Sequence, residues 1–302
     1  MNFEPPKAKE IKAAFPQFQE VLFLNAGGFK AVYKIVASGG PEAFKIVHIP
    51  EVSGVDPDVG KEIRKESLGR IAREIKILNN CKSPEIVKLG SIQPAPVVVD
   101  NREYIAYSEE YLDGNSLREL IRQSIKPAEE DIRSLFLSLL KAIREIWSFN
   151  IIHRDIKPDN VMMLNRKDRR YVVLDLGIAY SAVDTPLTFD ASHRLPPGTY
   201  RYLAPEMLQP GFRESIDFRS DIYAAALTVY EYAAGQHPLA KNKDDLITTL
   251  SRIVRESPPS LKAFRPDLSS TIIRTVDQML KKIPALRPSN INMLINQLEG
   301  KI

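Results

Sequence analysis

The chain of 302 residues carries 42 Lys and Arg against 38 Asp and Glu, a formal net charge of +4. So small an excess, spread along the chain, gives no reason to expect a nucleic-acid partner. Hydrophobic residues make up 44% and charged residues 26% of the chain, which is typical of globular proteins and excludes a disordered or fibrous one. The length allows one large domain or two lobes with a sizeable core.

Cysteine content and hydropathy bear on the cellular compartment. The single cysteine, Cys81, excludes an intrachain disulfide, and residues 1–20 lack a charged-then-apolar leader. The longest apolar stretch, around 222–234, is interrupted by Glu231 and is shorter than the roughly 20 residues that a membrane span needs. We therefore expect a cytoplasmic protein with no membrane partner.

The first part of the chain has the patterns of strands. Residues 4–7 are expected to form a frayed lead-in. Apolar runs at 21–24, 31–36 and 43–47, separated by glycine-containing turns, predict an antiparallel meander. Residues 49–60 contain two prolines and two glycines and are interpreted as an exposed insertion; their Asp-Pro-Asp lacks the rest of a calcium loop.

Helical spacing appears next and then dominates the second half. Apolar residues at a helical period over 61–79 predict a helix, and strands are predicted at 86–92 and 104–108. The polar stretch 109–114 then suits a lobe boundary. The later predicted elements are a buried helix at 131–147 with Trp147 in the core, a strand at 171–174, and helices at 217–234 and 270–282.

The stretch His153–Asn160 concentrates the chemistry. It places an acid (Asp155), a cation (Lys157) and a carboxamide (Asn160) within six residues. These groups suit phosphoryl transfer, in which an acceptor hydroxyl is aligned and a metal-bound phosphate is neutralised. The alternative is a solvated surface turn.

From about Leu22 to Pro288 the chain resembles a eukaryotic-type (Hanks-type) protein kinase. The family's His-Arg-Asp-x-Lys-Pro-x-Asn is complete as His153–Asn160, Asp-Phe-Gly appears as Asp175-Leu176-Gly177, and Ala-Pro-Glu appears as Ala204-Pro205-Glu206. The resemblance implies an α+β, bilobal fold with a small antiparallel-sheet N-lobe, one main helix in it, and a larger helical C-lobe. The expected limits are 1–19 for the lead-in, 20–109 for the N-lobe, 110–114 for the hinge and 115–302 for the C-lobe.

The resemblance also implies roles for single residues, with ATP and Mg²⁺ as cofactors. Asp155 would orient and deprotonate the acceptor hydroxyl, while Lys157 would offset charge on the transferring phosphoryl. Asn160 and Asp175 would be the metal ligands. Two further catalytic residues are expected: Lys45, holding the α- and β-phosphates, and its partner Glu74.

The nucleotide cover departs from the family pattern. Aligning Val32 with the family's valine puts Asn25, Gly27 and Lys30 at the three glycine positions, so only the middle glycine is kept, and Gly28 adds flexibility. This loss puts nucleotide affinity in doubt.

The hinge would offer backbone groups of Glu110 and Leu112 to adenine. The residue at the back of that pocket is then Glu109, which could pair with Lys45, or Ser108 if the register differs by one.

Two further residues match structural positions of the family. Asp221 would steady the backbone of the catalytic loop, and Arg287 would pair with Glu206. Both would act on rate through geometry, because a displaced catalytic group loses rate steeply.

Substrate class and control are also implied by the resemblance. Lys157 and Thr199 favour the serine/threonine branch, so protein Ser and Thr hydroxyls are the expected acceptors. Arg154 is of the kind that gathers an activation-segment phosphate. Candidate sites of autophosphorylation are Ser181, Thr185, Thr188 and Ser192, with Ser192 and Thr188 preferred. No extra domain is expected to flank the kinase-like region, which leaves sensing to the lobes or to a separate regulatory protein.

Three alternatives stay open at this point. The altered glycine loop suits a pseudokinase that serves as a nucleotide-binding scaffold. A small-molecule kinase of related fold would usually lack Lys157 and Ala204-Pro205-Glu206. A nucleotidyl-transferring relative would move AMP instead of phosphate. Neither a P-loop nor a dinucleotide-binding glycine motif is present.

Overall fold

The computed structural model describes residues 3–27, 30–48, 68–69, 71–72, 75, 77–165, 170–175, 199–209, 216–241 and 243–301. These residues form two compact units. The first holds the described residues up to Cys81 together with Val87–Leu112, and the second holds Lys82–Ile86 and the described residues from Asp113 onward. The lobe limits expected from the sequence stay a prediction.

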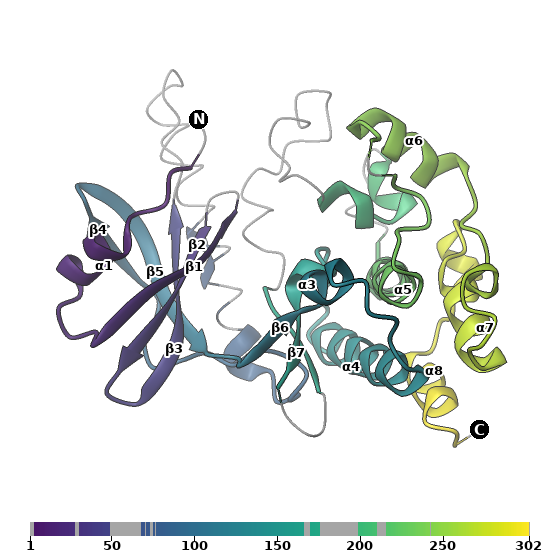
Figure 1. The fold of residues 1–302 in the computed structure, drawn as a ribbon, viewed down its shortest axis with the longest axis horizontal. Helices are drawn as coiled ribbons and strands as arrows, with labels where there is room; N and C mark the ends of the chain where they lie inside the picture. Colours follow the sequence, from purple (N-terminus) through teal and green to yellow (C-terminus); the bar gives the residue numbers. More distant parts are fainter. Residues whose placement is uncertain are drawn as a thin grey trace. The chain divides into compact units, whose positions relative to one another are not determined.

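The first unit is built on an antiparallel sheet of five strands in the order β1-β2-β3-β5-β4 (Figure 1). The strands are β1 (Glu20–Gly27), β2 (Lys30–Ala37), β3 (Gly40–His48), β4 (Ala95–Val99) and β5 (Arg102–Glu110). The predicted meander is confirmed as β1, β2 and β3, because β-branched and aromatic residues alternate there between the two faces of the sheet. The predicted strand at 104–108 is confirmed within β5.

The register of this sheet aligns residues far apart in the sequence. Asn25 is opposite Val32, Val32 is opposite Lys45, and Lys45 is opposite Tyr107. Residues directly opposite one another in antiparallel strands project to the same face. Asn25, Val32, Lys45 and Tyr107 therefore form one cross-strand row.

The predicted strand at 86–92 is wrong. Ile86 makes a single parallel bridge to Val173, and Leu89 makes a single antiparallel bridge to Glu109. Because the segment meets two different strands, one in each unit, it builds no continuous ladder. The edge strand beside β5 is instead β4, which sequence analysis missed and which pairs with β5 from Ala95 to Val99.

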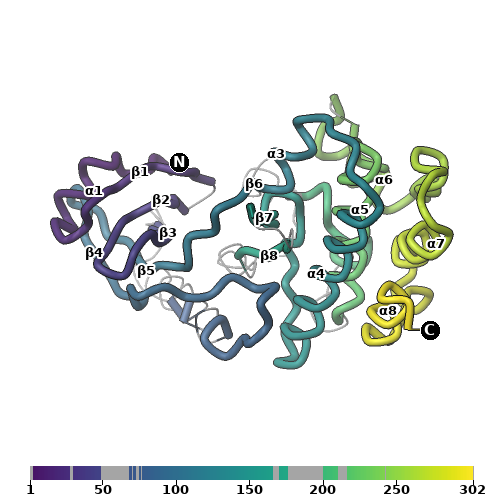
Figure 2. The backbone as a smooth tube through the Cα atoms, turned by 60° about the horizontal axis from the view of Figure 1, so that its bottom comes forward, coloured from purple at the N-terminus to yellow at the C-terminus, as the bar shows by residue number. Residues whose placement is uncertain are grey.

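The predicted fraying of residues 4–7 does not hold at Pro6, which is buried and whose carbonyl accepts a hydrogen bond from the Tyr33 hydroxyl. Helix α1 (Ala8–Ala14) follows these residues and was not predicted from the sequence. Its Ile11 is fully buried in the core of the first unit. Figure 2 shows α1 beside β1 and β4. The apolar residues of this segment therefore complete the core instead of fraying.

The predicted helix at 61–79 is described only in part. Its described residues up to Asn80 are helical, and Ile71, Ile75 and Leu78 are buried as their spacing predicts. The predicted insertion at 49–60 lies outside the described residues.

The second unit is mainly helical, as predicted, and the α+β class is confirmed. Its helices are α3 (Leu117–Arg122), α4 (Glu129–Trp147), α5 (Phe218–Ala234), α6 (Leu246–Arg255), α7 (Ser270–Met279) and α8 (Ile291–Leu298). A small antiparallel sheet holds β6 (Gly114–Ser116), β7 (Val161–Leu164) and β8 (Tyr171–Val173) in that order. Helices α4 and α5 pack against each other, and their ribbons are neighbours in Figure 1.

Two predictions for the helices need correction. Trp147 is only partly buried at the end of α4, where its ring packs at 5.4 Å from that of Phe218, so it is not a core residue. Helix α7 ends at Met279, three residues before the predicted end.

Among helices of the described residues, none has both the length and the apolar character that a bilayer crossing requires.

Candidate active site

The loop after α4 is held by the Asp221 carboxylate on α5. Both carboxylate oxygens of Asp221 accept backbone bonds, from the N–H of His153 at 2.7 Å and the N–H of Arg154 at 2.8 Å. Arg154 has a φ of +65°, a left-handed conformation that is strained for a residue with a side chain. The predicted role of Asp221 in steadying this loop is confirmed, and its two bonds help hold Arg154 in that conformation.

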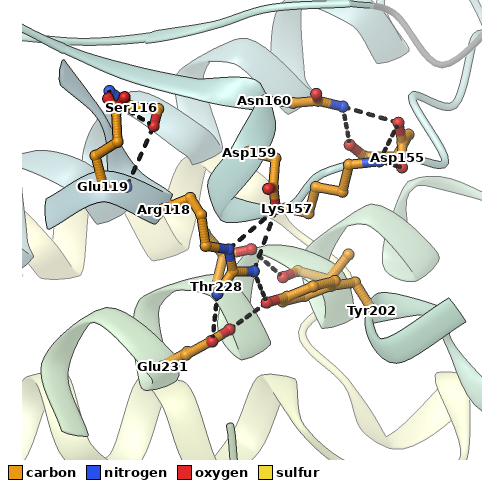
Figure 3. Close-up of polar contacts among 11 residues, drawn as sticks. Ser116, Arg118, Glu119, Asp155, Lys157, Asp159, Asn160, Tyr202, Thr228 and Glu231 are labelled. Atoms are coloured by element: carbon orange, nitrogen blue, oxygen red, sulfur yellow. Dashed lines mark hydrogen bonds and ion pairs between the residues drawn. The ribbon is translucent and has the colours of Figure 1, made fainter. Parts of the chain in front are cut away.

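Asp155 is the centre of a compact polar group that is visible in Figure 3. The Lys157 ammonium donates to both of its carboxylate oxygens, at 2.8 and 2.9 Å, and the Asn160 side-chain amide donates to Oδ2 at 2.8 Å. The same amide nitrogen also donates to the Asp155 carbonyl at 2.9 Å. The three residues singled out in the sequence are thus in direct contact.

Burial raises the pKa of Asp155 above its ordinary value of 3.8. Lys157 and the Asn160 amide oppose that rise, whereas the neighbouring charge of Asp175 adds to it. A carboxylate in such a place is a better proton acceptor than a solvated one, provided that the two donors keep it ionised.

The turn at residues 158–160 and the end of β8 are joined by a backbone bond. The N–H of Asn160 donates to the Lys157 carbonyl at 2.9 Å, and the N–H of Leu174 donates to the Asn160 carbonyl at 2.8 Å. Asp175 follows directly with a φ of +50°. The two expected metal ligands, Asn160 and Asp175, are therefore carried by hydrogen-bonded segments.

The donor set at these two residues fits Mg²⁺. Because both bonds of the Asn160 amide nitrogen point to Asp155, its Oδ1 is the atom left for a cation. Within the described residues no three His, Cys, Asp or Glu side chains gather as a metal cage. Mg²⁺ needs none, since it is commonly held by one or two protein oxygens together with substrate phosphates and water.

In the first unit, Lys45 is paired with Glu109. Its ammonium lies 2.5 Å from Glu109 Oε1, and both side chains are almost fully buried. The register leaves Glu109 opposite Ala43, on the same face of the sheet as Lys45, whereas Ser108 is opposite Phe44 on the other face. The choice that the sequence left open is decided: Glu109 is on the Lys45 face, and the expected pairing with Lys45 is confirmed.

Of the other residues expected to bind the nucleotide, some lie in the described part of the chain and some do not. Asn25 and Gly27 lie in β1 and Val32 lies in β2, as described above. The N–H of Glu110 already donates to the Lys88 carbonyl at 2.9 Å, so the group that Glu110 has to offer adenine is its carbonyl. Leu112 is the last described residue of the first unit. Gly28, Glu74 and the four candidate phosphosites between 181 and 192 lie outside the described residues.

The predicted pairing of Arg287 with Glu206 is confirmed. The guanidinium donates from Nη1 at 2.6 Å and from Nη2 at 2.8 Å to the two carboxylate oxygens. Arg287 also donates to the Arg219 carbonyl at 2.9 Å. The two-point bond joins the segment after Ala204 to Arg287, which follows α7 in the chain, and the bond to Arg219 links both to the start of α5.

Sequence reasoning missed a second polar cluster beside the catalytic loop, made by Arg118, Asp159, Tyr202 and Glu231 (Figure 3). Arg118 has no local signal, because a charge on a short helix is usually solvated. The available signal was Glu231, an acid that interrupts the apolar stretch 222–234 and needs a partner when it is buried.

Comparisons with known proteins agree with this geometry. A family model described as protein kinase domain matches residues 20–298. A solved structure described as the crystal structure of Rad53 1-466 in complex with AMP-PNP superposes with a TM-score of 0.69 at 23% identity, covering 94% of this chain and 65% of that one. The predicted bilobal kinase fold is confirmed by this likeness.

Curated relatives include two with serine/threonine names. A probable serine/threonine-protein kinase SCO3848 of Streptomyces coelicolor is 29% identical over 72% of this chain and 31% of its own length. A probable serine/threonine-protein kinase PknB of Bifidobacterium longum is 28% identical over 70% and 31%, respectively. The dual specificity mitogen-activated protein kinase kinase mek-1 of Caenorhabditis elegans is 32% identical over 59% and 48%. The chain thus spans between about a third and a half of these relatives.

Proposed function

The chain belongs to the protein kinase family, and on that premise we propose that it transfers the γ-phosphate of ATP to serine and threonine hydroxyls of other proteins. The observation that carries the proposal is the buried Asp155 carboxylate, held at once by Lys157 and Asn160. An unproductive surface turn would not bury an acid and satisfy it in this way.

The proposed roles follow from these contacts. Asp155 accepts the proton of the acceptor hydroxyl and aims its oxygen, a step of general-base type. Lys157 is bonded to both oxygens of Asp155, and it would also offset charge on the phosphoryl group during transfer. Asn160 and Asp175 would hold Mg²⁺, which supplies charge neutralisation on the phosphates when bound. Lys45 would hold the α- and β-phosphates, with Glu74 as its helical partner.

The first unit contributes the nucleotide contacts in this proposal. Asn25, Gly27, Gly28 and Val32 would cover the nucleotide, and backbone groups of Glu110 and Leu112 would meet adenine. Because Lys45 already has Glu109 as a buried partner, phosphate and Glu109 share one ammonium. We expect this sharing to weaken nucleotide binding relative to a chain with a neutral residue at 109.

The test is transfer of labelled γ-phosphate from Mg·ATP to serine, threonine and tyrosine peptides and to the protein itself, with Asp155→Asn as the control. Label on serine or threonine that depends on Asp155 supports the proposal. Two relatives have serine/threonine names and one is of dual specificity, so the tyrosine peptide decides the branch. Equal labelling by wild type and Asp155→Asn, at the background level, would favour the scaffold that the altered glycine loop suggests.

Self-labelling needs its own readout. Mass mapping after incubation with Mg·ATP would locate phosphate among Ser181, Thr185, Thr188 and Ser192, with Ser192 and Thr188 the expected pair. Absence of phosphate from that segment would contradict autophosphorylation there without contradicting transfer to other proteins. A separate regulatory protein stays part of the proposal and would be sought by its effect on transfer rate.

A further inference from the structure

Arg118 ties the catalytic loop to two other parts of the second unit. Its guanidinium donates from Nε and Nη2 to Asp159 Oδ2, both at 3.2 Å, and from Nη1 to Glu231 Oε1 at 2.6 Å. It also donates to the Tyr202 hydroxyl, and that hydroxyl donates to the other oxygen of Glu231. Figure 3 shows the guanidinium at the meeting point of these three groups.

The cluster is protected from solvent at its centre and open at one end. The side chain of Arg118 is 19% exposed and that of Glu231 only 7%, whereas the Asp159 carboxylate is 48% exposed. Burial works against the charge of Arg118, but Tyr202, Glu231 and Asp159 outweigh it and raise the pKa of the guanidinium. Burial and Glu231 likewise raise the pKa of Tyr202, so the phenol stays neutral. The Arg118 guanidinium therefore binds two carboxylates and a phenol at once.

The start of α3 fixes where this guanidinium is anchored. Ser116 and Glu119 form a capping box: the Ser116 hydroxyl accepts from the Glu119 N–H at 3.2 Å, and the Glu119 carboxylate accepts from the Ser116 N–H at 2.8 Å. Arg118 is the second residue of this helix. Its fork of donors is rigid and planar, which lets it bridge separate acids in a set geometry.

Asp159 links this cluster to the proposed catalytic residues Asn160 and Asp155. It stands between Pro158 and Asn160 in a single tight turn, closed by the Asn160 N–H on the Lys157 carbonyl. A shift of Asp159 therefore moves Asn160, and the Asn160 side-chain amide is one of the donors that hold Asp155. The path from Arg118 to Asp155 consists of two hydrogen-bonded contacts, Arg118 with Asp159 and Asn160 with Asp155, joined by one turn.

We propose that Arg118 is a positioning residue for phosphotransfer, which acts by anchoring Asp159 and thereby the Asn160 side chain against Asp155. This inference rests on the proposed function. The same guanidinium anchors Tyr202, in the segment just ahead of Ala204-Pro205-Glu206, to α5 through Glu231. Loss of the anchor misplaces Asn160 and Asp155 without touching the nucleotide contacts of the first unit.

The kinetic test compares Arg118→Gln, Arg118→Lys and Asp159→Asn with wild type. We expect Arg118→Gln to lower kcat by about 10- to 100-fold, since a misplacement of about 1 Å can cost about 100-fold in rate, and to raise the Mg²⁺ concentration for half-maximal rate. Nucleotide affinity should stay as in wild type. Arg118→Lys should be intermediate, because an ammonium lacks the fork that reaches Asp159 and Glu231 together.

The matched control is Arg133→Gln on α4. Arg133 also pairs with a carboxylate at 2.6 Å, that of Glu129, and is partly buried in the same unit. It should cost stability without changing kcat or the Mg²⁺ requirement. In the double variant Arg118→Gln/Asp159→Asn, the loss of kcat should not exceed that of Arg118→Gln alone, since both changes cut the same link.

A second readout does not depend on turnover. The Asn160 side-chain amide gives a pair of signals in ¹H–¹⁵N spectra, identified by their loss in Asn160→Asp, and they should shift in Arg118→Gln and Asp159→Asn but not in Arg133→Gln. If wild type transfers no phosphate, the proposed function is refuted. The spectra still test whether Arg118 positions the Asn160 side chain.

Several outcomes would overturn the inference. One is a folded Arg118→Gln with wild-type kcat, Mg²⁺ requirement and Asn160 signals. Another is strict additivity in the double variant. If Arg118→Gln does not fold, Asp159→Asn decides, because its exposed carboxylate can be changed without opening the core: wild-type kinetics and spectra there would refute the role.

Discussion

Two buried lysine–carboxylate pairs, one in each unit, have different origins. Asp155 and Lys157 are two residues apart and belong to one loop, and Asn160 in that loop supplies a further donor. Lys45 and Glu109 come from different strands, β3 and β5, and are brought together by strand register. The Asp155–Lys157 pair is determined by a short sequence motif, whereas the Lys45–Glu109 pair forms only when the sheet has formed.

The difference teaches how each pair can serve the reaction. The Asp155 pair lies within the loop that α5 holds through Asp221, so its geometry is set before any substrate arrives. The Lys45 pair joins the lysine that we propose binds phosphate to an acid that would compete for its ammonium. We therefore expect changes at Asp155 to act on turnover and changes at Glu109 to act on nucleotide affinity.

The largest effect is expected from Asp155→Asn. Loss of the proposed proton acceptor should lower kcat by about 10²–10⁴-fold. The matched change Glu109→Gln should keep kcat within a few-fold, about the size of an ordinary hydrogen-bond effect, and should tighten Mg·ATP binding. Initial rates and titration calorimetry on the two variants check both halves; a collapse of kcat in Glu109→Gln would break the comparison.

The next effect is on stability in the first unit. Lys45→Met leaves the Glu109 carboxylate buried without its lysine, which should lower the free energy of unfolding by about 3–5 kcal/mol. The double variant Lys45→Met/Glu109→Leu removes both charges and should recover most of that loss. Urea unfolding of the two variants measures this. If the double variant is no more stable than Lys45→Met, the pair is not the source of the loss.

A smaller loss is expected at the pair Glu206–Arg287. Glu206→Gln removes the two charge-assisted bonds and should cost about 1.5–3 kcal/mol. The loss stays below that for Lys45→Met because carbonyls of Arg219, Lys281 and Lys282 still accept from the guanidinium. Urea unfolding beside Lys45→Met tests the order, and a larger cost for Glu206→Gln would reverse it.

The smallest effect concerns pH. Burial raises the pKa of Asp155, so the proton acceptor is lost by protonation at a higher pH than an ordinary aspartate allows. The acid limb of kcat/KM should therefore lie above pH 3.8. Lys157→Met removes a cation that favours the carboxylate, which raises the pKa of Asp155 further and moves the limb to higher pH. Rate profiles of wild type and Lys157→Met, each scaled to its own maximum, test the direction; an unchanged or lower limb would contradict it.

Much of the fold was readable from local patterns. Alternation and turn residues predicted β1 to β3, and helical spacing predicted α4 and α5, because each element buries one face by its own period. The strand at 86–92 was wrong and helix α1 was missed for the same reason: the local pattern of a segment does not show what the segment will pack against. Ile86 and Leu89 met different partners, and Ile11 met the core.

The sequence alone determined the set of candidate catalytic groups. Asp155, Lys157 and Asn160 are spaced so closely that one loop brings them into contact, and the Asp221 and Arg287 partnerships were predictable from the family motifs. What only the tertiary structure decided was every contact between distant segments. Strand register chose Glu109 over Ser108 as the neighbour of Lys45, and the meeting of α3, α5 and the catalytic loop made a cluster around Arg118. Register and helix packing are set by the whole buried surface, which no local stretch of residues encodes.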